Sequence, residues 1–284
     1  MIEKLFLSVG AMKAGTTWLH QQLADHPNIH FTPEKEVHYF AAPTGAAHPM
    51  RLADRIARYQ RVVSNLQPDR FNARVQRNLE WYAKSYLEPI VDAAWYENLF
   101  AEKKGDAWCA DFSNLYCLLD SEGWGRVREM AGSIRVVYSL RNPISQMWSH
   151  VKFQHEFAGL DAKLQIWSPA DFAAFFSKPG AAGHSDYAAN LALLRRNLDP
   201  SELKVLFFET IRSSPLQSLN QIEAFLGIDV RSYRAERLAA QVNPSVSQPM
   251  PTAFVAFARP HYLRQCEQLD RMGISLPAEW DRGE

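Results

Sequence analysis

The sequence predicts a single α/β domain in which helices flank a central parallel sheet of the phosphate-loop type. Three observations lead to this fold class. Short apolar runs rich in β-branched residues recur along the chain, segments of helical length separate them, and the first run leads directly into a glycine-containing turn. Strands that alternate with helices in this way form βαβ units with parallel strands. The 284 residues suffice for one large domain, which we expect to span residues 1–284.

The chain begins with a predicted strand, turn and helix. Residues 5–9 form a short apolar run typical of a buried strand, and a turn over residues 10–15 precedes a helix from about Thr16 to Ala24. Residues 29–31 predict a second, short strand. The start of the chain therefore has the order of elements expected for an α/β unit.

The pattern changes over about residues 44–105, which we expect to be a helical insertion. Proline, glycine and alanine come first, and an arginine-rich stretch then carries apolar side chains at helical spacing, at positions 52, 56, 59 and 63. A further helix is predicted over about residues 93–102. We expect this insertion to leave the core of the domain.

The second half of the chain resumes the alternation of strands and helices. Gly227 suits the C-terminus of the last predicted helix. Residues 158–184 contain glycine, proline and alanine among aromatic residues, and we interpret them as a loop or lid with one short helix. The other expected elements are strands over 134–140 and 203–208 and helices over 144–157, 187–198 and 216–226.

The composition is that of a globular protein, and it argues against one class of partner. Hydrophobic residues make up 47% of the chain and charged residues 22%. Lysine plus arginine and aspartate plus glutamate both number 31, so the formal net charge is zero. A protein that coats nucleic acid needs an excess of positive charge. We therefore expect no nucleic-acid partner, although a local basic pocket for a small anion remains compatible with this balance.

The cysteines and the apolar runs indicate a reducing compartment and no membrane anchor. The three cysteines form no CxxC pair, which favours buried free thiols. The apolar run at the N-terminus is too short for a signal peptide, and no run approaches the roughly 18 residues of a membrane span. The sequence thus predicts a cytoplasmic protein without a membrane span.

The strongest local signal is the turn between Val9 and Trp18. A strand, a tight turn and a helix start gather backbone N–H groups and a helix N-terminus around one point, which favours anion binding. The two glycines keep the spacing of the nucleotide triphosphatase loop, G-x-x-x-x-G-K-[ST]. However, Thr16 follows the second glycine, and the lysine comes two residues before it as Lys13. The pattern therefore predicts a phosphate loop that differs from a kinase loop.

The end of the strand over residues 134–140 argues against a metal-dependent reaction. ATP-cleaving enzymes of the phosphate-loop class hold Mg²⁺ with a loop hydroxyl and an acidic residue at a strand end. Here the strand is followed by Arg141. A guanidinium group suits a second phosphate better than a metal. We therefore expect no metal.

The segment Lys13–Trp18 resembles the 5′-phosphosulfate loop of the sulfotransferases that use 3′-phosphoadenosine 5′-phosphosulfate (PAPS). The resemblance implies that the lysine contacts the sulfate and its bridging oxygen. It also implies that loop amides and threonine hydroxyls hold the 5′-phosphate, and that the tryptophan packs on adenine. The donor-binding residues implied are Lys13, Ala14, Gly15, Thr16, Thr17 and Trp18.

A second motif resembles the 3′-phosphate site of the same family. Arg141 stands at a strand end, and Ser149 follows eight residues later, near the start of the predicted helix. The planar guanidinium and the serine hydroxyl are suitable donors to phosphate oxygens. Two phosphate sites in the order of the family support each other. The resemblance covers roughly residues 5–245, although the basic Lys-Gly-Arg element that closes over the nucleotide in relatives is missing around Asn243–Ser245.

The general base is expected in the segment Pro33–Phe40. Glu36-Val-His38-Tyr-Phe40 resembles the Glu-x-His-Phe-Phe element of the heparan sulfate sulfotransferases and many bacterial relatives. This match implies Glu36 as the base and His38 as the neighbour that orients it. His38 as the base is the alternative, because other sulfotransferases use a histidine. On an extended segment both side chains would lie on one face.

The resemblance implies the fold and activity of a PAPS-dependent sulfotransferase. The acceptor would be a hydroxyl, in preference to an amine, of a carbohydrate or small molecule. The products would be a sulfate ester and 3′-phosphoadenosine 5′-phosphate (PAP). The segment 110–116 resembles one that lines the acceptor cleft of relatives, but Phe112 replaces a lysine there, which argues against a highly charged polysaccharide. The insertion and the segment 158–184 would shape the acceptor pocket.

Two other functions remain as alternatives. A phosphate-loop nucleotide kinase is disfavoured because no lysine follows Gly15. A nucleotide-binding module without catalysis is disfavoured because Glu36 and His38 are both present.

Overall fold

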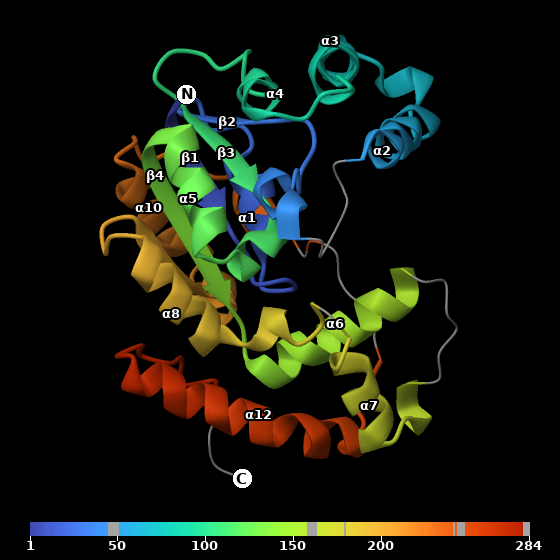
Figure 1. Cartoon of the computed structure of the whole chain (residues 1–284), viewed down its shortest axis with the longest axis vertical. Helices are drawn as coiled ribbons and strands as arrows, with labels where there is room; N and C mark the ends of the chain where they lie inside the picture. The colour runs from blue at the N-terminus through green and yellow to red at the C-terminus, as the bar shows by residue number, and fades with distance from the viewer. Residues whose placement is uncertain (45–50, 158–163, 179, 241, 243–247, 281–284) are drawn as a thin grey trace.

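The computed structural model describes residues 1–44, 51–157, 164–178, 180–240, 242 and 248–280. Its centre is a sheet of five strands in the order β2-β3-β1-β4-β5 (Figure 1). Every neighbouring pair of strands is parallel, which confirms the predicted fold class. The strands are β1 (Ile2–Ser8), β2 (Ile29–Phe31), β3 (Trp108–Phe112), β4 (Ala131–Leu140) and β5 (Leu203–Phe207).

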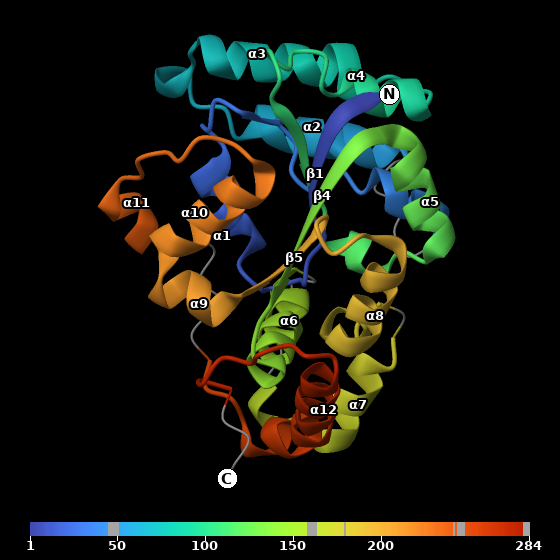
Figure 2. The same ribbon diagram turned by 90° about the vertical axis from the view of Figure 1, so that its left-hand side faces the viewer.

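Helices cover both faces of the sheet, as a parallel sheet requires. Along β1, Leu5 and Leu7 point into one core cluster while Phe6 points into the other. Seen along the sheet, α1 (Thr16–Leu23), α9 (Phe208–Ser213) and α10 (Pro215–Leu226) lie on one side (Figure 2). On the other side are α5 (Ser121–Met130) and α8 (Tyr187–Asn197).

The insertion is helical, but the expectation that it leaves the core was wrong, because its aromatic side chains pack into the larger core cluster. Trp81, Tyr86, Trp95 and Tyr96 are all buried together with side chains of the sheet. In Figure 1, α3 and α4 lie beyond the amino ends of the strands, and α4 is shorter than the predicted helix over residues 93–102. The elements are α2 (Leu52–Ser64), α3 (Ala73–Trp81), a π-helical turn (Tyr82–Tyr86) and α4 (Ala93–Asn98).

A third cluster lies beyond the carboxyl ends of the strands (Figure 1). Helices α6 (Pro143–Phe157), α7 (Pro169–Phe176) and α12 (Thr252–Arg271) contribute its side chains. The described part of the segment 158–184 consists of α7 and two short 3₁₀ turns. The sequence predicted α6 closely but gave no indication of α12.

Candidate active site

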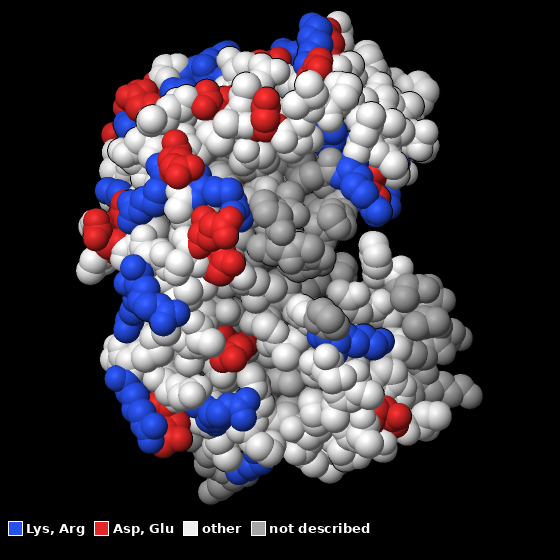
Figure 3. Space-filling model, in the orientation of Figure 1, with Lys and Arg blue, Asp and Glu red and all other residues white. Residues whose placement is uncertain are grey.

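A cavity of about 1010 Å³ lies at the carboxyl ends of β1 and β4. From these two neighbouring strands the chain proceeds to opposite sides of the sheet, so the cavity lies at the topological switch point where α/β sheets bind ligands. The space-filling view shows a notch in the outline between the end of α2 and the region of α6 and α7 (Figure 3). Side chains from α1, α6, α9 and α11 (Ala235–Ala239) line the cavity.

The charged side chains of the cavity are strongly biased toward positive charge. Among the described residues that line it, one carboxylate, Glu36, accompanies four cations, Lys13, Arg141, Lys152 and Arg212. The chain as a whole has a formal net charge of zero. Burial lowers the pKa of Lys13, and the charges of Arg141 and Lys152 lower it further, although Glu156 opposes them. This electrostatic environment favours a polyanionic ligand.

The turn between β1 and α1 has a backbone conformation that depends on glycine. Gly15 has a φ of 88°, and a Cβ there would lie 3.0 Å from Cδ2 of Phe208. Helix α1 starts at Thr16 with no side-chain cap on its N-terminal N–H groups. These N–H groups are therefore available to a ligand at the cavity, which Gly15, Thr16 and Thr17 line.

Lys13 is held by its backbone, while its side chain remains without an ion pair among the described residues. Its carbonyl accepts a hydrogen bond from Nη1 of Arg141 at 3.1 Å. Its ammonium lies 4.8 Å from the centroid of the Phe153 ring. Trp18, one turn into α1, is 9% exposed and lines the cavity as well as contributing to a core cluster.

Arg141 and Ser149 both line the cavity. Ser149 lies in the first half of α6, which begins at Pro143, one residue before its predicted start. Ser145, one helical turn earlier, also lines the cavity, and the spacing of four residues between the two serines could have revealed it. The Arg141 guanidinium lies 4.5 Å from the Phe208 ring centroid.

Glu36 and His38 meet as predicted, but through a different backbone conformation. Oε2 of Glu36 lies 3.1 Å from Nε2 of His38, and Oε1 lies 2.8 Å from Nζ of Lys35. The segment is not extended: Glu36 has a φ of 65° and His38 a φ of 61°, both left-handed. The side chains therefore meet across a turn and not on one face of a strand.

The pKa of Glu36 reflects opposing influences. Burial raises it, whereas the charge of Lys35 and the hydrogen bond and charge of His38 lower it, with a net decrease to about 2. Glu36 is consequently ionised at neutral pH. Its side chain is 25% exposed and lines the cavity. His38 is not among the lining residues, and its Nδ1 is buried without a hydrogen-bond partner in the described part of the chain.

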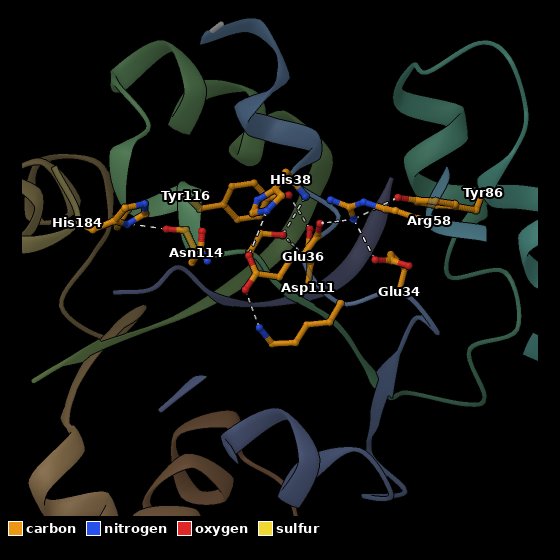
Figure 4. Close-up of polar contacts among 12 residues, drawn as sticks. Glu34, Glu36, His38, Arg58, Tyr86, Asp111, Asn114, Tyr116 and His184 are labelled. Carbon is orange, nitrogen blue, oxygen red and sulfur yellow. Dashed lines mark hydrogen bonds and ion pairs between the residues drawn. The ribbon is translucent and has the colours of Figure 1, made fainter. Parts of the chain in front are cut away.

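A buried polar cluster lies behind Glu36 and His38 (Figure 4). Asp111, at the end of β3, accepts hydrogen bonds from the hydroxyls of Ser113 at 2.6 Å, Tyr116 at 2.6 Å and Tyr96 at 3.0 Å. Of the segment 110–116, only Asn114 lines the cavity. The sequence linked this segment to the acceptor cleft but gave no indication of the cluster, since a buried aspartate on a strand has no local pattern.

Other expectations concern residues around the edge of the site. The segment Asn243–Ser245, where the basic element of the relatives is missing, lies outside the described residues, while Val242 and Met250 line the cavity. The described residues contain no group of three or more histidine, cysteine, aspartate or glutamate side chains that could hold a metal. None of the helices in the described ranges is long and apolar enough to cross a membrane.

Known structures resemble this fold over nearly its whole length. A sulfotransferase from Alicyclobacillus acidocaldarius is 20% identical, with a TM-score of 0.67 and 99% of both chains covered. The sulfotransferase domain of the olefin synthase of Synechococcus PCC 7002 is 18% identical, with a TM-score of 0.54 and 98% of this chain and 96% of that chain covered. At these identities the likeness concerns the fold.

The sulfotransferase domain of the curacin biosynthetic pathway gives a similar result. It is 17% identical, with a TM-score of 0.56 and coverage of 98% of this chain and 99% of that chain. A comparison with curated protein sequences finds no match. The model of the sulfotransferase family matches residues 6–232, which is most of the sequence and extends from the end of β1 past α10. The chain therefore belongs to the sulfotransferase family.

Proposed function

We propose that this protein transfers a sulfuryl group from PAPS to a hydroxyl group of a carbohydrate or small-molecule acceptor. The observation that carries the proposal is the cavity at the ends of β1 and β4, where four cations face one carboxylate. PAPS carries its negative charge on a 5′-phosphosulfate and a 3′-phosphate. The open N-terminus of α1 suits the first group, and Arg141 with Ser149 suits the second.

The reaction divides among three groups of the cavity. The acceptor oxygen forms a bond to sulfur while the bond between sulfur and the bridging oxygen of the 5′-phosphate breaks. Glu36 takes the proton of the acceptor hydroxyl. Lys13 stabilises the electron pair left on the bridging oxygen of PAP. The amides and hydroxyls of the turn at Gly15–Thr17 keep the donor aligned for attack.

The geometry favours Glu36 over His38 as the base. Glu36 reaches the cavity, whereas Nε2 of His38 is directed at Glu36 and its Nδ1 is buried. A carboxylate with a pKa of about 2 is ionised but accepts a proton poorly. An acceptor hydroxyl that replaces the Lys35 contact would raise the basicity of Glu36 as it binds. His38 then serves to orient the carboxylate.

Binding of PAP by calorimetry in the presence of EDTA tests the donor class, with ATP and ADP as controls. We expect micromolar binding of PAP that Arg141→Ala weakens about tenfold to a hundredfold, the range for a hydrogen bond to a charged group. Binding of ATP alone, and only with Mg²⁺, would instead support a nucleotide kinase.

Sulfuryl transfer from labelled PAPS to a panel of hydroxyl acceptors tests catalysis. Lys13→Ala and Glu36→Gln should each bind PAP and fail in transfer. Full activity of either variant would remove that residue from the proposed mechanism. Normal PAP binding without transfer to any acceptor would favour a non-catalytic nucleotide-binding module.

A further inference from the structure

The Asp111 carboxylate is an unusual group to find inside this core. Its side chain lies at the end of a central strand, and the residue is only 2% exposed. No described cation forms an ion pair with it, and burial raises its pKa, while three hydroxyl donors and the charge of His38 oppose that effect. A buried carboxylate without a cation is costly, so its presence calls for a role that an apolar side chain could not fill.

Ser113 connects Asp111 to the turn that carries Glu36 and His38 through two hydrogen bonds. A serine hydroxyl has a single hydrogen to donate. Ser113 donates it to Oδ1 of Asp111 at 2.6 Å, so its oxygen is free to accept, and it accepts from the backbone N–H of His38 at 2.9 Å. One residue before Ser113, the carbonyl of Phe112 accepts the backbone N–H of Glu36 at 3.2 Å. The end of β3 therefore holds both left-handed residues by their N–H groups.

Tyr116 connects the same carboxylate to the ring of His38. Its hydroxyl donates to Oδ2 of Asp111, and its ring lies edge-on to the His38 imidazole, with centroids 6.4 Å apart and an interplanar angle of 89°. Figure 4 shows Asp111, Tyr116, His38 and Glu36 converging at one place. Left-handed conformations of residues other than glycine persist only where the surroundings impose them. The cluster supplies that constraint.

We propose that Asp111 and Ser113 are positioning residues that hold Glu36 and His38 in the conformation required for proton transfer. The proposal rests on the role proposed for Glu36 above. Neither Asp111 nor Ser113 lines the cavity, so they act on the reaction through the turn and not on the donor. Their loss should therefore change catalysis while donor binding stays intact.

Ser113→Ala is the primary test, because it removes the hydrogen bond to His38 and leaves Asp111 in place. We expect kcat to fall about tenfold to a hundredfold, a smaller loss than the roughly 10²- to 10⁴-fold contribution of a positioned base, because the base itself remains. The KM for PAPS and the Kd for PAP should stay within about twofold of the wild-type values, since the donor contacts are unchanged. Ser113→Thr, which keeps a hydroxyl, should recover most of the lost kcat.

The pH dependence of kcat gives a readout that a general loss of stability would not move. The contact with His38 lowers the pKa of Glu36. When the turn relaxes and this contact loosens, the pKa of Glu36 rises, so the acidic limb of kcat in Ser113→Ala should shift to higher pH. Asp111→Asn, which disturbs the same hydrogen bond from the other end, should shift the limb in the same direction.

Tyr96→Phe is the matched control. This substitution removes the third hydrogen bond to Asp111, and the hydroxyl that it deletes forms no hydrogen bond with Glu36 or His38. We expect wild-type kcat and pH profile for this variant. An equal loss of kcat in Tyr96→Phe and Ser113→Ala would overturn the inference, and so would an unchanged kcat and acidic limb in Ser113→Ala. If Glu36→Gln is inactive while Ser113→Ala is fully active, only the positioning role of Ser113 is contradicted. If Glu36→Gln is active, the proposed role of Glu36 as the base is contradicted.

Discussion

The low pKa of Glu36 is due to its charged neighbours, which overcome the opposite effect of burial. Burial alone would raise the pKa of this carboxyl group, but Lys35 and His38 outweigh it. The charge of Lys35, 2.8 Å away, is the largest single influence that lowers this pKa. The sequence singled out both Glu36 and His38, whereas the importance of Lys35 became clear only from its contact with Oε1. A lysine beside a glutamate in sequence is usually a solvated surface residue.

Lys35→Met should therefore make Glu36 a stronger base. Without the ammonium, the pKa of Glu36 rises from about 2 toward the ordinary value for glutamate. The carboxylate of the variant is therefore protonated at a higher pH than that of the wild type. We expect the acidic limb of kcat/KM to move to higher pH. Rates of transfer measured from about pH 3 upward at constant ionic strength check this, because the limb of the variant should enter that range while that of the wild type lies below it. An acidic limb at the same pH in both proteins would show that Lys35 does not lower the pKa of Glu36.

At the scale of elements, the sequence predicted those whose periodicity was regular. Strands β1, β2, β4 and β5 and helices α1, α6, α8 and α10 lie within a few residues of their predicted bounds. Strand β3 was missed because its sequence, Trp-Cys-Ala-Asp-Phe, contains no β-branched residue and a charged one, so neither an apolar run nor an alternating pattern marks it. Helix α12 was missed because charged residues interrupt its apolar stripe and Pro260 lies within it.

The parts of the site that directly follow a strand could be predicted from short sequence motifs. The glycine turn and the strand-end arginine have fixed positions relative to their strands, so Lys13 and Arg141 could be assigned to one end of the sheet. The cluster around Asp111 combines residues from β3, α4 and the turn that follows β3. Such a cluster depends on tertiary packing, which no short segment of sequence encodes.

Helix α7 provides a test of the expected lid. Phe172 is fully buried against side chains of α6 and α12, with an exposure of 0%. Phe172→Ala should lower the free energy of unfolding by about 3–5 kcal/mol, the usual cost for a phenylalanine in a packed core. Urea denaturation measures the change.

The nearby Ile166 is a control from the same segment. It is 78% exposed, so Ile166→Ala should change the free energy of unfolding by less than about 0.5 kcal/mol. A small effect of Phe172→Ala, comparable with that of Ile166→Ala, would indicate that α7 spends much of its time away from the core, as a mobile lid would.

Positive charge is concentrated in the cavity of a molecule whose formal net charge is zero, so the rest of the chain carries a small excess of negative charge. Lysine and arginine equal aspartate and glutamate in number over the chain, so the excess of positive charge at the ends of β1 and β4 is local. Long-range attraction of the donor is therefore weak, and most of the electrostatic contribution to binding arises at short range within the cavity.

Donor binding should depend on salt in proportion to ligand charge. We expect the Kd of PAP to rise steadily between low ionic strength and about 1 M salt, where the Debye length shrinks to about 3 Å. Adenosine 5′-monophosphate, which lacks the 3′-phosphate, should show a shallower dependence. Calorimetric titrations of both ligands at several salt concentrations check this. Equal slopes would mean that the 3′-phosphate does not contact the cations of the cavity.

The order of the strands also determines when the donor site can form during folding. The turn after β1 is attached to β4, and the bond from Arg141 to the carbonyl of Lys13 joins residues 128 positions apart. Closing so long a loop is slow, because the chain loses conformational entropy before the contacts between the distant parallel strands stabilise it. We therefore expect the turn after β1 to acquire its shape only after the two halves of the chain have paired. If the turn binds the donor as proposed, bound nucleotide should stabilise the folded state of both halves.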